Sequence, residues 1–284
     1  MISGPSVPAR ILAWIGGAWS ASLPGQVVSL GWRVAVSPFR GRRSTFRQLV
    51  DMFLQQTYFT AVEPVVIVLL LAVLIGGVTL VEFTTLLPRL GTSNVLGEVM
   101  VLAIVRELGP LFTAFLVAGR SGSALATYIG NMKVAGEVDS LEAMGIDPVR
   151  FLVLPAVLGC TVGLACLSLV FTAAALFGGF FLAQMLVLLF PGSLGLETGF
   201  LPYLDRISSA LSATDLVLIV FKPAVFGLVV ALLASLSGLS LEKSPHEVPQ
   251  GTRSAVVQSF VSIVLLDGIF ATMFVIPGLA GVLP

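Results

Sequence analysis

Charged side chains are scarce in this sequence. Only 11% of its 284 residues are Asp, Glu, Lys or Arg, while 57% are hydrophobic. A soluble domain averages about 25% charged residues, so the composition excludes an ordinary soluble domain and predicts a membrane protein. Fifteen basic and fifteen acidic residues cancel. This balance excludes a broad nucleic-acid-binding surface, and we expect no nucleic acid among the partners.

Cysteine and histidine are almost absent. Cys160 and Cys166 lie in one apolar run and His246 is the single histidine, so neither a disulfide framework nor a metal site is expected. The sequence contains no Gly-x-x-x-x-Gly-Lys-Ser/Thr phosphate loop and no nucleophile elbow. We therefore expect no catalytic residue, no metal and no cofactor in this chain, and a membrane-embedded enzyme acting on lipids is disfavoured.

Long apolar runs dominate what is present. A membrane-spanning helix needs about 20 mostly apolar residues, and five segments meet this length. The fold class expected is all-α: a polytopic membrane protein with about five transmembrane helices, preceded by an N-terminal interfacial helix. The expected spans are about 61–82, 95–128, 151–190, 215–239 and 255–276, within a helical domain at 61–284.

Lys and Arg are distributed unequally over the connections between these spans. Cytoplasmic connections carry an excess of Lys and Arg. Ten such residues fall on the side of the N-terminus, whereas Arg89 and Arg206 fall on the other. We therefore expect a cytoplasmic N-terminus and, with five spans, a C-terminus on the opposite side. The ten residues are Arg10, Arg33, Arg40, Arg42, Arg43, Arg47, Lys133, Arg150, Lys243 and Arg253.

The first sixty residues are mixed in character. Residues 11–36 combine three tryptophans with small residues, which favours a helix lying in the headgroup region. A sixth span over 11–36 is the alternative, weakened by Pro24 and Arg33. We expect residues 1–60 to form a cytoplasmic, interfacial amphipathic region.

Six ionisable side chains fall within the expected spans. Such groups are costly in a bilayer and therefore mark functional positions. Arg106 and Glu107 point about 100° apart on a helix, so each needs its own partner. We expect Asp267 to pair with Arg106, either to fix helix packing or to contact a substrate. The six candidates for a substrate path or in-membrane polar role are Glu98, Arg106, Glu107, Arg120, Lys222 and Asp267.

Small residues surround Arg120. The segment 118–124 reads Ala-Gly-Arg-Ser-Gly-Ser-Ala, a composition that predicts close helix–helix packing. We expect Arg120 to reach the headgroups or to brace the next segment. Before it, Gly109-Pro110 is expected to kink the second span.

The connection after the second span combines an apolar stripe with an acidic face. Gly145 is expected to cap a short helix and Pro148 to prevent its continuation. An amphipathic helix outside the membrane suits a groove in another protein. Lying on the membrane surface is the alternative, which the acidic face disfavours. The stripe consists of Val134, Val138, Leu141 and Met144, and the acidic residues are Glu137, Asp139 and Glu142.

The order of these motifs resembles the MlaE-type (YrbE-type) permease family and its chloroplast lipid-import relatives. The resemblance runs from about residue 50 to the end, and its motifs are specific in combination. It is carried by Arg106-Glu107-Leu108-Gly109-Pro110, Ala118-Gly119-Arg120-Ser121-Gly122-Ser123-Ala124, Gly130-x-Met132-Lys133, Leu141-Glu142-x-Met144-Gly145-Ile146-Asp147-Pro148, and the later segment from Gly251 and Arg253 to Asp267.

The resemblance implies the permease subunit of an ABC transporter that moves phospholipids or other hydrophobic molecules. It implies a homodimer in the inner (cytoplasmic) membrane, a separate cytoplasmic ABC ATPase that holds ATP and Mg, and an MCE-domain lipid-binding protein on the far side. It also implies that a coupling helix at 130–147 docks into the ATPase. The coupling candidates are Asn131, Met132, Lys133, Val134, Glu137, Val138, Asp139, Leu141, Glu142, Met144 and Gly145.

A lipid needs an apolar cavity with a polar end. We expect the first and fifth spans to supply the apolar part at the dimer interface, and Glu98 and Lys222 to supply the polar end.

Two other functions stay open. One is the permease of an importer for a small solute, since Glu142-Ala143-x-Gly145 and Leu154-Pro155 loosely resemble an importer coupling loop. The other is an ATP-independent carrier or channel, with the in-span charges as an ion path.

Overall fold

The computed structural model describes residues 23–36, 43–92, 95–189, 199–241 and 244–280. Within these ranges every regular element is a helix, which confirms the all-α class. Five helices are long and apolar enough to cross a membrane, as expected. They cover Leu49–Arg89, Leu96–Val134, Val149–Leu189, Ala213–Leu239 and Pro245–Met273.

The first span is longer than expected from its apolar run. Helix α3 (Arg43–Thr57) passes through a π-helical turn η2 (Tyr58–Val62) into α4 (Val65–Arg89). The 41 residues from Leu49 to Arg89 extend about 60 Å at 1.5 Å per residue, twice the hydrocarbon thickness. The helix therefore continues well beyond the membrane at one or both ends.

The second span is interrupted by wide turns. Its segments are α5 (Leu96–Met100), the π-helical η4 (Val101–Leu108), α6 (Gly109–Val117), the π-helical η5 (Ala118–Gly122) and α7 (Ser123–Val134). Pro110 lies in the first turn of α6, and the helix continues into α6 from η4, since Leu108 and Gly109 both have helical backbone angles. Such π-turns often mark functional positions in helices.

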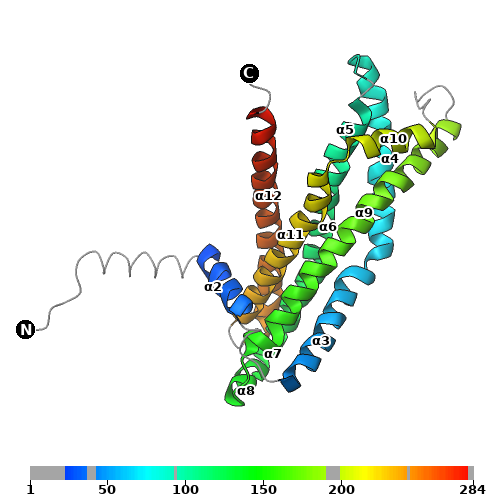
Figure 1. Cartoon of the computed structure of the whole chain (residues 1–284). Helices are drawn as coiled ribbons and strands as arrows, with labels where there is room; N and C mark the ends of the chain where they lie inside the picture. The colour runs from blue at the N-terminus through cyan, green and yellow to red at the C-terminus, as the bar shows by residue number, and fades with distance from the viewer. Residues whose placement is uncertain (1–22, 37–42, 93–94, 190–198, 242–243, 281–284) are drawn as a thin grey trace, which may run out of the picture.

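Helix α9 is the centre of the molecule. It follows the π-helical η6 (Val149–Val153), runs from Leu154 to Leu189 and packs against α4 and against α11 (Ala213–Leu239) (Figure 1). The α4–α9 contact is close, because a Cβ on Gly76 would lie 2.0 Å from the carbonyl oxygen of Ala175. Glycine at this position lets the two backbones approach closely.

A short helix replaces part of the connection expected at 191–214. Helix α10 (Phe200–Ala210) buries Tyr203 and Ile207 against the end of α9, and Tyr203 donates a hydrogen bond to the carbonyl oxygen of Leu176 at 3.2 Å. Its ring stacks on Phe180 with centroids 4.9 Å apart. Burial raises the pKa of the Tyr203 hydroxyl. Aromatic packing therefore orders part of the connection between the third and fourth spans as a helix.

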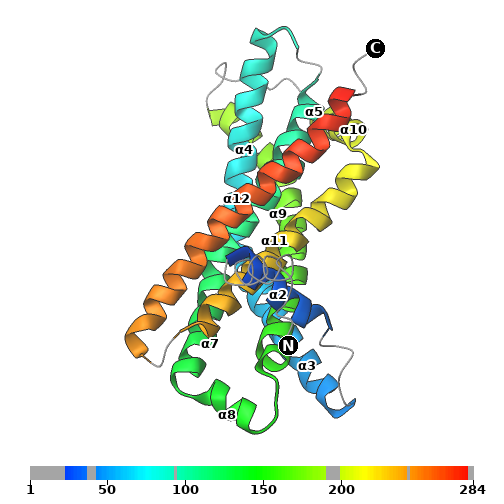
Figure 2. The ribbon, with the colours of Figure 1, turned by 90° about the vertical axis from the view of Figure 1, so that its left-hand side faces the viewer.

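The two ends of the molecule are distinct. Helix α8 (Glu137–Ala143) lies at one end of the long axis, near the start of α3 (Figures 1 and 2). Helix α10 lies at the other end, towards which α12 (Val248–Ala280) runs after the 3-10 turn η7 (Pro245–Glu247). We refer to these as the α8 end and the α10 end.

Helices α2 and α12 are attached to this core in different ways. Helix α2 (Leu23–Val36) packs against α11 and η6, and its 14 residues extend about 21 Å, too short to cross the bilayer alone. The remainder of the 11–36 segment lies outside the described residues. Helix α12 contacts α7 and α11, yet only 11% of its most apolar stretch is buried, against 67% for the α9 span.

Candidate functional site

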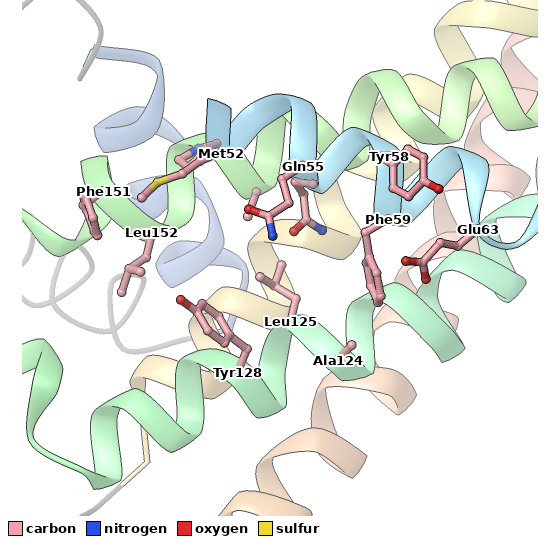
Figure 3. A pocket seen from close by; sticks show the side chains of 13 residues that line it. Met52, Gln55, Tyr58, Phe59, Glu63, Ala124, Leu125, Tyr128, Phe151 and Leu152 are labelled. Atoms are coloured by element: carbon pink, nitrogen blue, oxygen red, sulfur yellow. The ribbon is translucent and has the colours of Figure 1, made fainter. Parts of the chain in front are cut away.

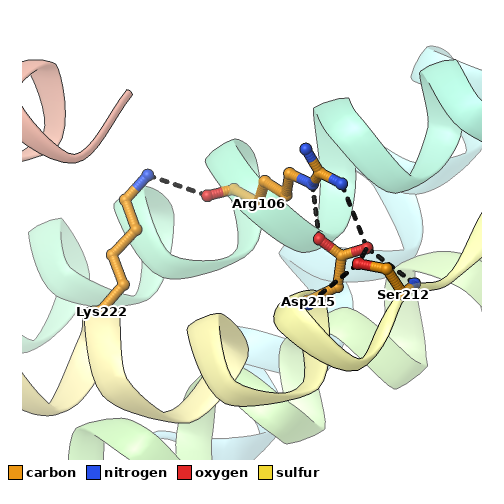
Figure 4. A network of polar contacts seen from close by, with 4 residues as sticks. All are labelled: Arg106, Ser212, Asp215 and Lys222. Carbon is orange, nitrogen blue, oxygen red and sulfur yellow. Dashed lines mark hydrogen bonds and ion pairs between the residues drawn. The ribbon is translucent and has the colours of Figure 1, made fainter. Parts of the chain in front are cut away.

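An ion pair between Arg106 and Asp215 joins the second and fourth spans. The Nε atom of Arg106 donates to Oδ1 of Asp215 at 2.6 Å, and Nη2 donates to Oδ2 at 3.2 Å (Figure 4). This two-point geometry is the strong form of an arginine–carboxylate contact. The Asp215 side chain is fully buried, so the pair fixes the start of α11 against η4.

The same carboxylate forms the cap of α11. The backbone N–H and the hydroxyl of Ser212 donate to Oδ2 of Asp215 at 3.0 and 2.9 Å. In return, the Ser212 hydroxyl accepts from the Asp215 backbone N–H, which completes a capping box. Asp215 therefore starts one helix and holds another.

Lys222 forms the second centre of the network. It lies in α11 with its side chain 3% exposed, and its ammonium donates to the Arg106 carbonyl oxygen at 2.8 Å and to Glu107 Oε2 at 2.9 Å. Asp267 Oδ1 of α12 lies 2.7 Å from the same nitrogen. Lys222 thus donates two hydrogen bonds, and its contact with Asp267 is an ion pair without hydrogen-bond geometry. Lys222 thereby joins the second, fourth and fifth spans.

The pairing differs from the sequence prediction in one respect. Arg106 pairs with Asp215 and not with Asp267, which instead binds Lys222. Separate partners for Arg106 and Glu107 are confirmed. Asp215 and Lys222 are seven residues apart, two helical turns, so both lie on one face of α11 and meet the two neighbouring residues of η4.

Asp215 was missed because it lies at the polar boundary of the fourth span. The available signal was Ser212-x-x-Asp215, a capping-box pattern directly before an apolar run. With all five groups ionised, the network of Arg106, Glu107, Asp215, Lys222 and Asp267 holds three carboxylates and two cations. Pairing of this kind is what makes charges tolerable inside a membrane.

Glu98 and Lys222 do not form the polar end of one cavity. The Lys222 ammonium is surrounded by protein oxygens, which makes it unavailable to a lipid headgroup. Glu98 is exposed on α5, about 13 Å along the helix from Glu107. The part of the prediction that concerns Lys222 was wrong because Asp267 of α12 pairs with it, whereas a role of Glu98 at a substrate cavity stays a prediction.

Arg120 braces the first span. From η5 its Nη1 donates to the Phe59 carbonyl oxygen at 2.9 Å, its Nη2 pairs with Glu63, and its guanidinium lies 4.7 Å from the centre of the Phe59 ring. A planar guanidinium suits this combination of pairing and stacking. The expectation that Arg120 braces the next segment was wrong, since it contacts an earlier one, whereas its contact with headgroups stays a prediction. Close packing of 118–124 is confirmed at Gly122, where a Cβ would lie 3.1 Å from Val230.

The coupling segment consists of two helices. Helix α7 ends at Val134, Gly136 has φ +77°, and α8 covers Glu137–Ala143. One continuous helix over 130–147 was therefore wrong, because the left-handed backbone at Gly136 ends the first helix. Lys133 Nζ lies 2.8 Å from Asp139 Oδ1 and ties α8 to α7.

The expected cap at Gly145 is confirmed. Gly145 has φ +76°, and its N–H donates to the carbonyl oxygen of Glu142 at 2.9 Å. The N–H of Ile146 donates to the carbonyl oxygen of Leu141, also at 2.9 Å. These bonds satisfy carbonyl groups at the end of α8.

The expected apolar stripe divides between two surfaces. Val138 is buried and Val134 and Leu141 are half-buried, whereas Met144 is 66% exposed. Of the remaining coupling candidates, Asn131, Glu137 and Glu142 are exposed, and Met132, Lys133 and Asp139 are half-buried. The outer surface of α8 is therefore acidic, with one exposed methionine at its C-terminal cap, and its docking to a partner stays a prediction.

A pocket of about 580 Å³ lies between α3 and α7 near the α8 end, and we name it the α3–α7 pocket. Helix α3 and η2 form one wall, α7 forms the other, and η6 with the start of α9 forms the floor (Figure 3). It could not be predicted from the sequence, because its lining comes from three stretches that lie far apart in the chain. Its lining residues are Met52, Gln55, Gln56, Tyr58, Phe59, Glu63, Ala124, Leu125, Tyr128, Phe151, Leu152, Pro155 and Ala156.

Comparison with known proteins places this geometry in context. A family model described as Permease MlaE matches residues 53–273. The chain is 29% identical to Protein TRIGALACTOSYLDIACYLGLYCEROL 1, chloroplastic, of Arabidopsis thaliana, over 78% of this chain and 61% of that protein. The chain thus spans less than two thirds of that relative.

Two bacterial relatives match over most of their length. One is described as a probable ABC transporter permease protein of Rickettsia prowazekii, 27% identical over 79% of this chain and 83% of that protein. The other is the intermembrane phospholipid transport system permease protein MlaE of Haemophilus influenzae. It is 29% identical over 80% of this chain and 85% of that protein.

Proposed function

Because this chain belongs to the MlaE permease family, we propose that it is the membrane subunit of an ABC transporter that moves phospholipids or related hydrophobic molecules between membranes. The observation that carries the proposal is the family match over residues 53–273, which includes the charge network and α8. The description of the Haemophilus influenzae relative as an intermembrane phospholipid transport permease supports the substrate class. In this function the chain is a transport subunit and not an enzyme.

The energy for transport comes from a separate ABC ATPase that binds ATP and Mg and contacts α8. Helix α8 lies between α7, which ends the second span, and η6, which begins the third. A push on α8 therefore acts directly on two spans. The network around Lys222 passes this movement on, because it ties the second span to the fourth and fifth.

A second copy of the chain covers the exposed face of α12. Only 11% of the most apolar stretch of the fifth span is buried, a far smaller share than in the other four spans. Val257, Val261, Val264 and Leu265 are all more than half exposed on this helix. A homodimer through this face would enclose an apolar cavity for a lipid between the two copies.

The α8 end lies in the cytoplasm and the α10 end on the opposite side of the inner membrane. The arginine-rich segment before the first span and the segments near α8 carry most of the basic residues outside the spans. An MCE-domain partner would then meet the α10 end, on the same side as the C-terminus.

The coupling assignment is tested by co-purification from native membranes. The test variant is Glu142→Arg with Met144→Asp, exposed on α8 and at its C-terminal cap, and the matched control is Ser208→Arg, exposed on α10. We expect an ATPase to accompany the wild type and the control, and to be lost from the α8 variant. If no ATPase accompanies any of the three, an ATP-independent carrier or channel replaces this proposal.

Bound material separates a lipid transporter from an importer of a small solute. We expect mass spectrometry of the purified transporter to detect co-purified phospholipid, and purified chain reconstituted with its ATPase to transfer labelled phospholipid between vesicles. A bound polar solute together with absence of lipid transfer would refute the lipid assignment and favour the importer.

A further inference from the structure

The α3–α7 pocket lies at the boundary between the apolar and polar layers of the membrane. The first span is free of charge from Val65 to Val81, about 25 Å of helix. The Glu63–Arg120 pair lies at the α8-end limit of this run and at the edge of the pocket. Met52, at the other edge, is about 16 Å further along the helix. The pocket therefore spans the depth at which lipid ester groups lie.

The lining combines apolar surface with uncharged polar groups. Glu63 is the one acidic or basic side chain among the thirteen lining residues, and Arg120 already pairs with it. The remaining polar groups are two amides and two phenols. These groups bind ester and hydroxyl oxygens, whereas a phosphate is normally bound by a cation or by a helix N-terminus. The four polar residues are Gln55, Gln56, Tyr58 and Tyr128.

We propose that the α3–α7 pocket binds the glycerol–ester region of a diacyl lipid taken from the leaflet at the α8 end. Gln55 from α3 and Tyr128 from α7 reach into the space between the two walls (Figure 3), and neither has a hydrogen-bond partner among the described residues. Together they offer an amide N–H and a phenol O–H to the ester carbonyl oxygens. The acyl chains leave past Phe59 and Leu125.

The other lining groups fit this arrangement. Gln56 is turned towards the floor, where its amide contacts the Thr60 hydroxyl at 3.4 Å and the Cys160 sulfur at 3.6 Å. This leaves Gln55 as the amide directed at the ligand. A volume of about 580 Å³ falls within the range of small-molecule pockets, about 300–1,000 Å³. It accommodates the polar centre of a diacyl lipid and the first part of its chains.

Recognition through neutral groups predicts indifference to the headgroup. Binding should depend little on ionic strength, because no unpaired charge of the lining takes part. Zwitterionic, anionic and headgroup-free diacyl lipids should bind with similar affinity. A site built for the phosphate would instead prefer anionic lipid and weaken with salt.

The position of the pocket links its occupancy to α8. One wall is α7, which continues through Gly136 into α8, and the other is α3 with η2. A lipid bonded to both walls holds α7 against α3. If α8 docks to an ATPase, a point that rests on the proposed function, ATP binding changes the lipid affinity of this pocket and lipid changes ATP affinity by the same factor.

The test measures binding of pyrene-labelled phosphatidylcholine, phosphatidylglycerol and diacylglycerol to the purified full chain in detergent. Ala124→Trp fills the pocket and should weaken binding of all three at least tenfold. Gln55→Leu with Tyr128→Phe removes the two donors at nearly constant volume and should weaken binding about 3- to 30-fold. The control Leu70→Trp, on an exposed position of α4, should leave binding unchanged.

Three outcomes would overturn the proposal. Phosphatidylglycerol binding more than tenfold tighter than phosphatidylcholine, with strong salt dependence, would indicate phosphate recognition. An equal loss in the Leu70→Trp control would indicate general lipid contact. Unchanged binding in the double variant, which adds no bulk and tests the site even if Ala124→Trp does not fold, would exclude these donors. ATPase co-purification with these variants is a separate readout, so a failure here leaves the transporter assignment standing.

Discussion

Replacing Lys222 by methionine tests the charge network most directly. The change removes the ammonium bound by three oxygens and keeps most of the side-chain volume. Glu107 and Asp267 are then left without their cation. Removing one partner of a buried ion pair typically costs about 3–5 kcal/mol, because the remaining charge stays buried. These carboxylates are 34% and 17% exposed, so we expect the lower end, about 3 kcal/mol.

Thermal unfolding of the purified protein in detergent measures this effect. A loss of about 3 kcal/mol corresponds to a decrease in Tm of roughly 6–12 °C for a chain of this size. The matched control is Lys133→Met, which breaks a more exposed pair with Asp139 and should cost about 1 kcal/mol or less. Adding Glu107→Gln and Asp267→Asn to Lys222→Met should recover most of the loss. Equal effects in Lys222→Met and Lys133→Met, or no recovery, would refute the network as a buried brace.

Three further predictions concern packing and hydrogen bonding. Gly76→Ala should decrease the free energy of unfolding by about 1–3 kcal/mol or more, because the added Cβ overpacks the α4–α9 contact. In the control Gly268→Ala nothing lies within 4 Å of the added Cβ, so the free energy of unfolding should not decrease. Thermal melts of the two variants measure the difference. Arg106→Lys keeps the charge but loses the two-point contact with Asp215, and should lower the Tm nearly as much as Arg106→Met. Because burial raises the pKa of Tyr203, the unfolded state loses its proton first, so wild-type stability should fall above pH about 10 relative to Tyr203→Phe. Melts from pH 8 to 11 measure that difference, and identical pH curves would contradict it.

The sequence was sufficient for the five spans and for one helix end. Runs such as Val65–Val81 leave few alternatives to a transmembrane helix. Gly145 could be assigned as a cap because a positive φ after an amphipathic segment strongly favours glycine. Both are local properties, readable from composition and spacing.

Pairing between residues far apart in the chain could not be predicted from the sequence. Arg106 could be seen to need a carboxylate, but choosing Asp215 over Asp267 depends on which spans are neighbours and how far each is shifted along the membrane normal. The same applies to Arg120, whose partner Glu63 lies 57 residues earlier in the chain. The α3–α7 pocket could not be predicted for the same reason, because no single segment contains all of its lining residues.

Helical structure in a short polar segment was the other feature that the sequence did not predict. Helix α10 contains Pro202, Asp205 and two serines around a small apolar face, so its composition resembles a loop. The stacking of Tyr203 on Phe180 makes it a helix, and that contact depends on where α9 ends.

The order in which the network residues are synthesised has a consequence for biogenesis. Arg106 precedes Asp215 by 109 residues, and Glu107 precedes Lys222 by 115. At about 5–20 residues per second the ribosome needs roughly 5–20 s to make the partners. During that interval the second span holds an arginine and a glutamate whose partners have not yet been made. These two charges therefore need a polar or hydrated environment, at the insertion machinery or beside it, until the fourth span supplies their partners and the second span can enter the lipid.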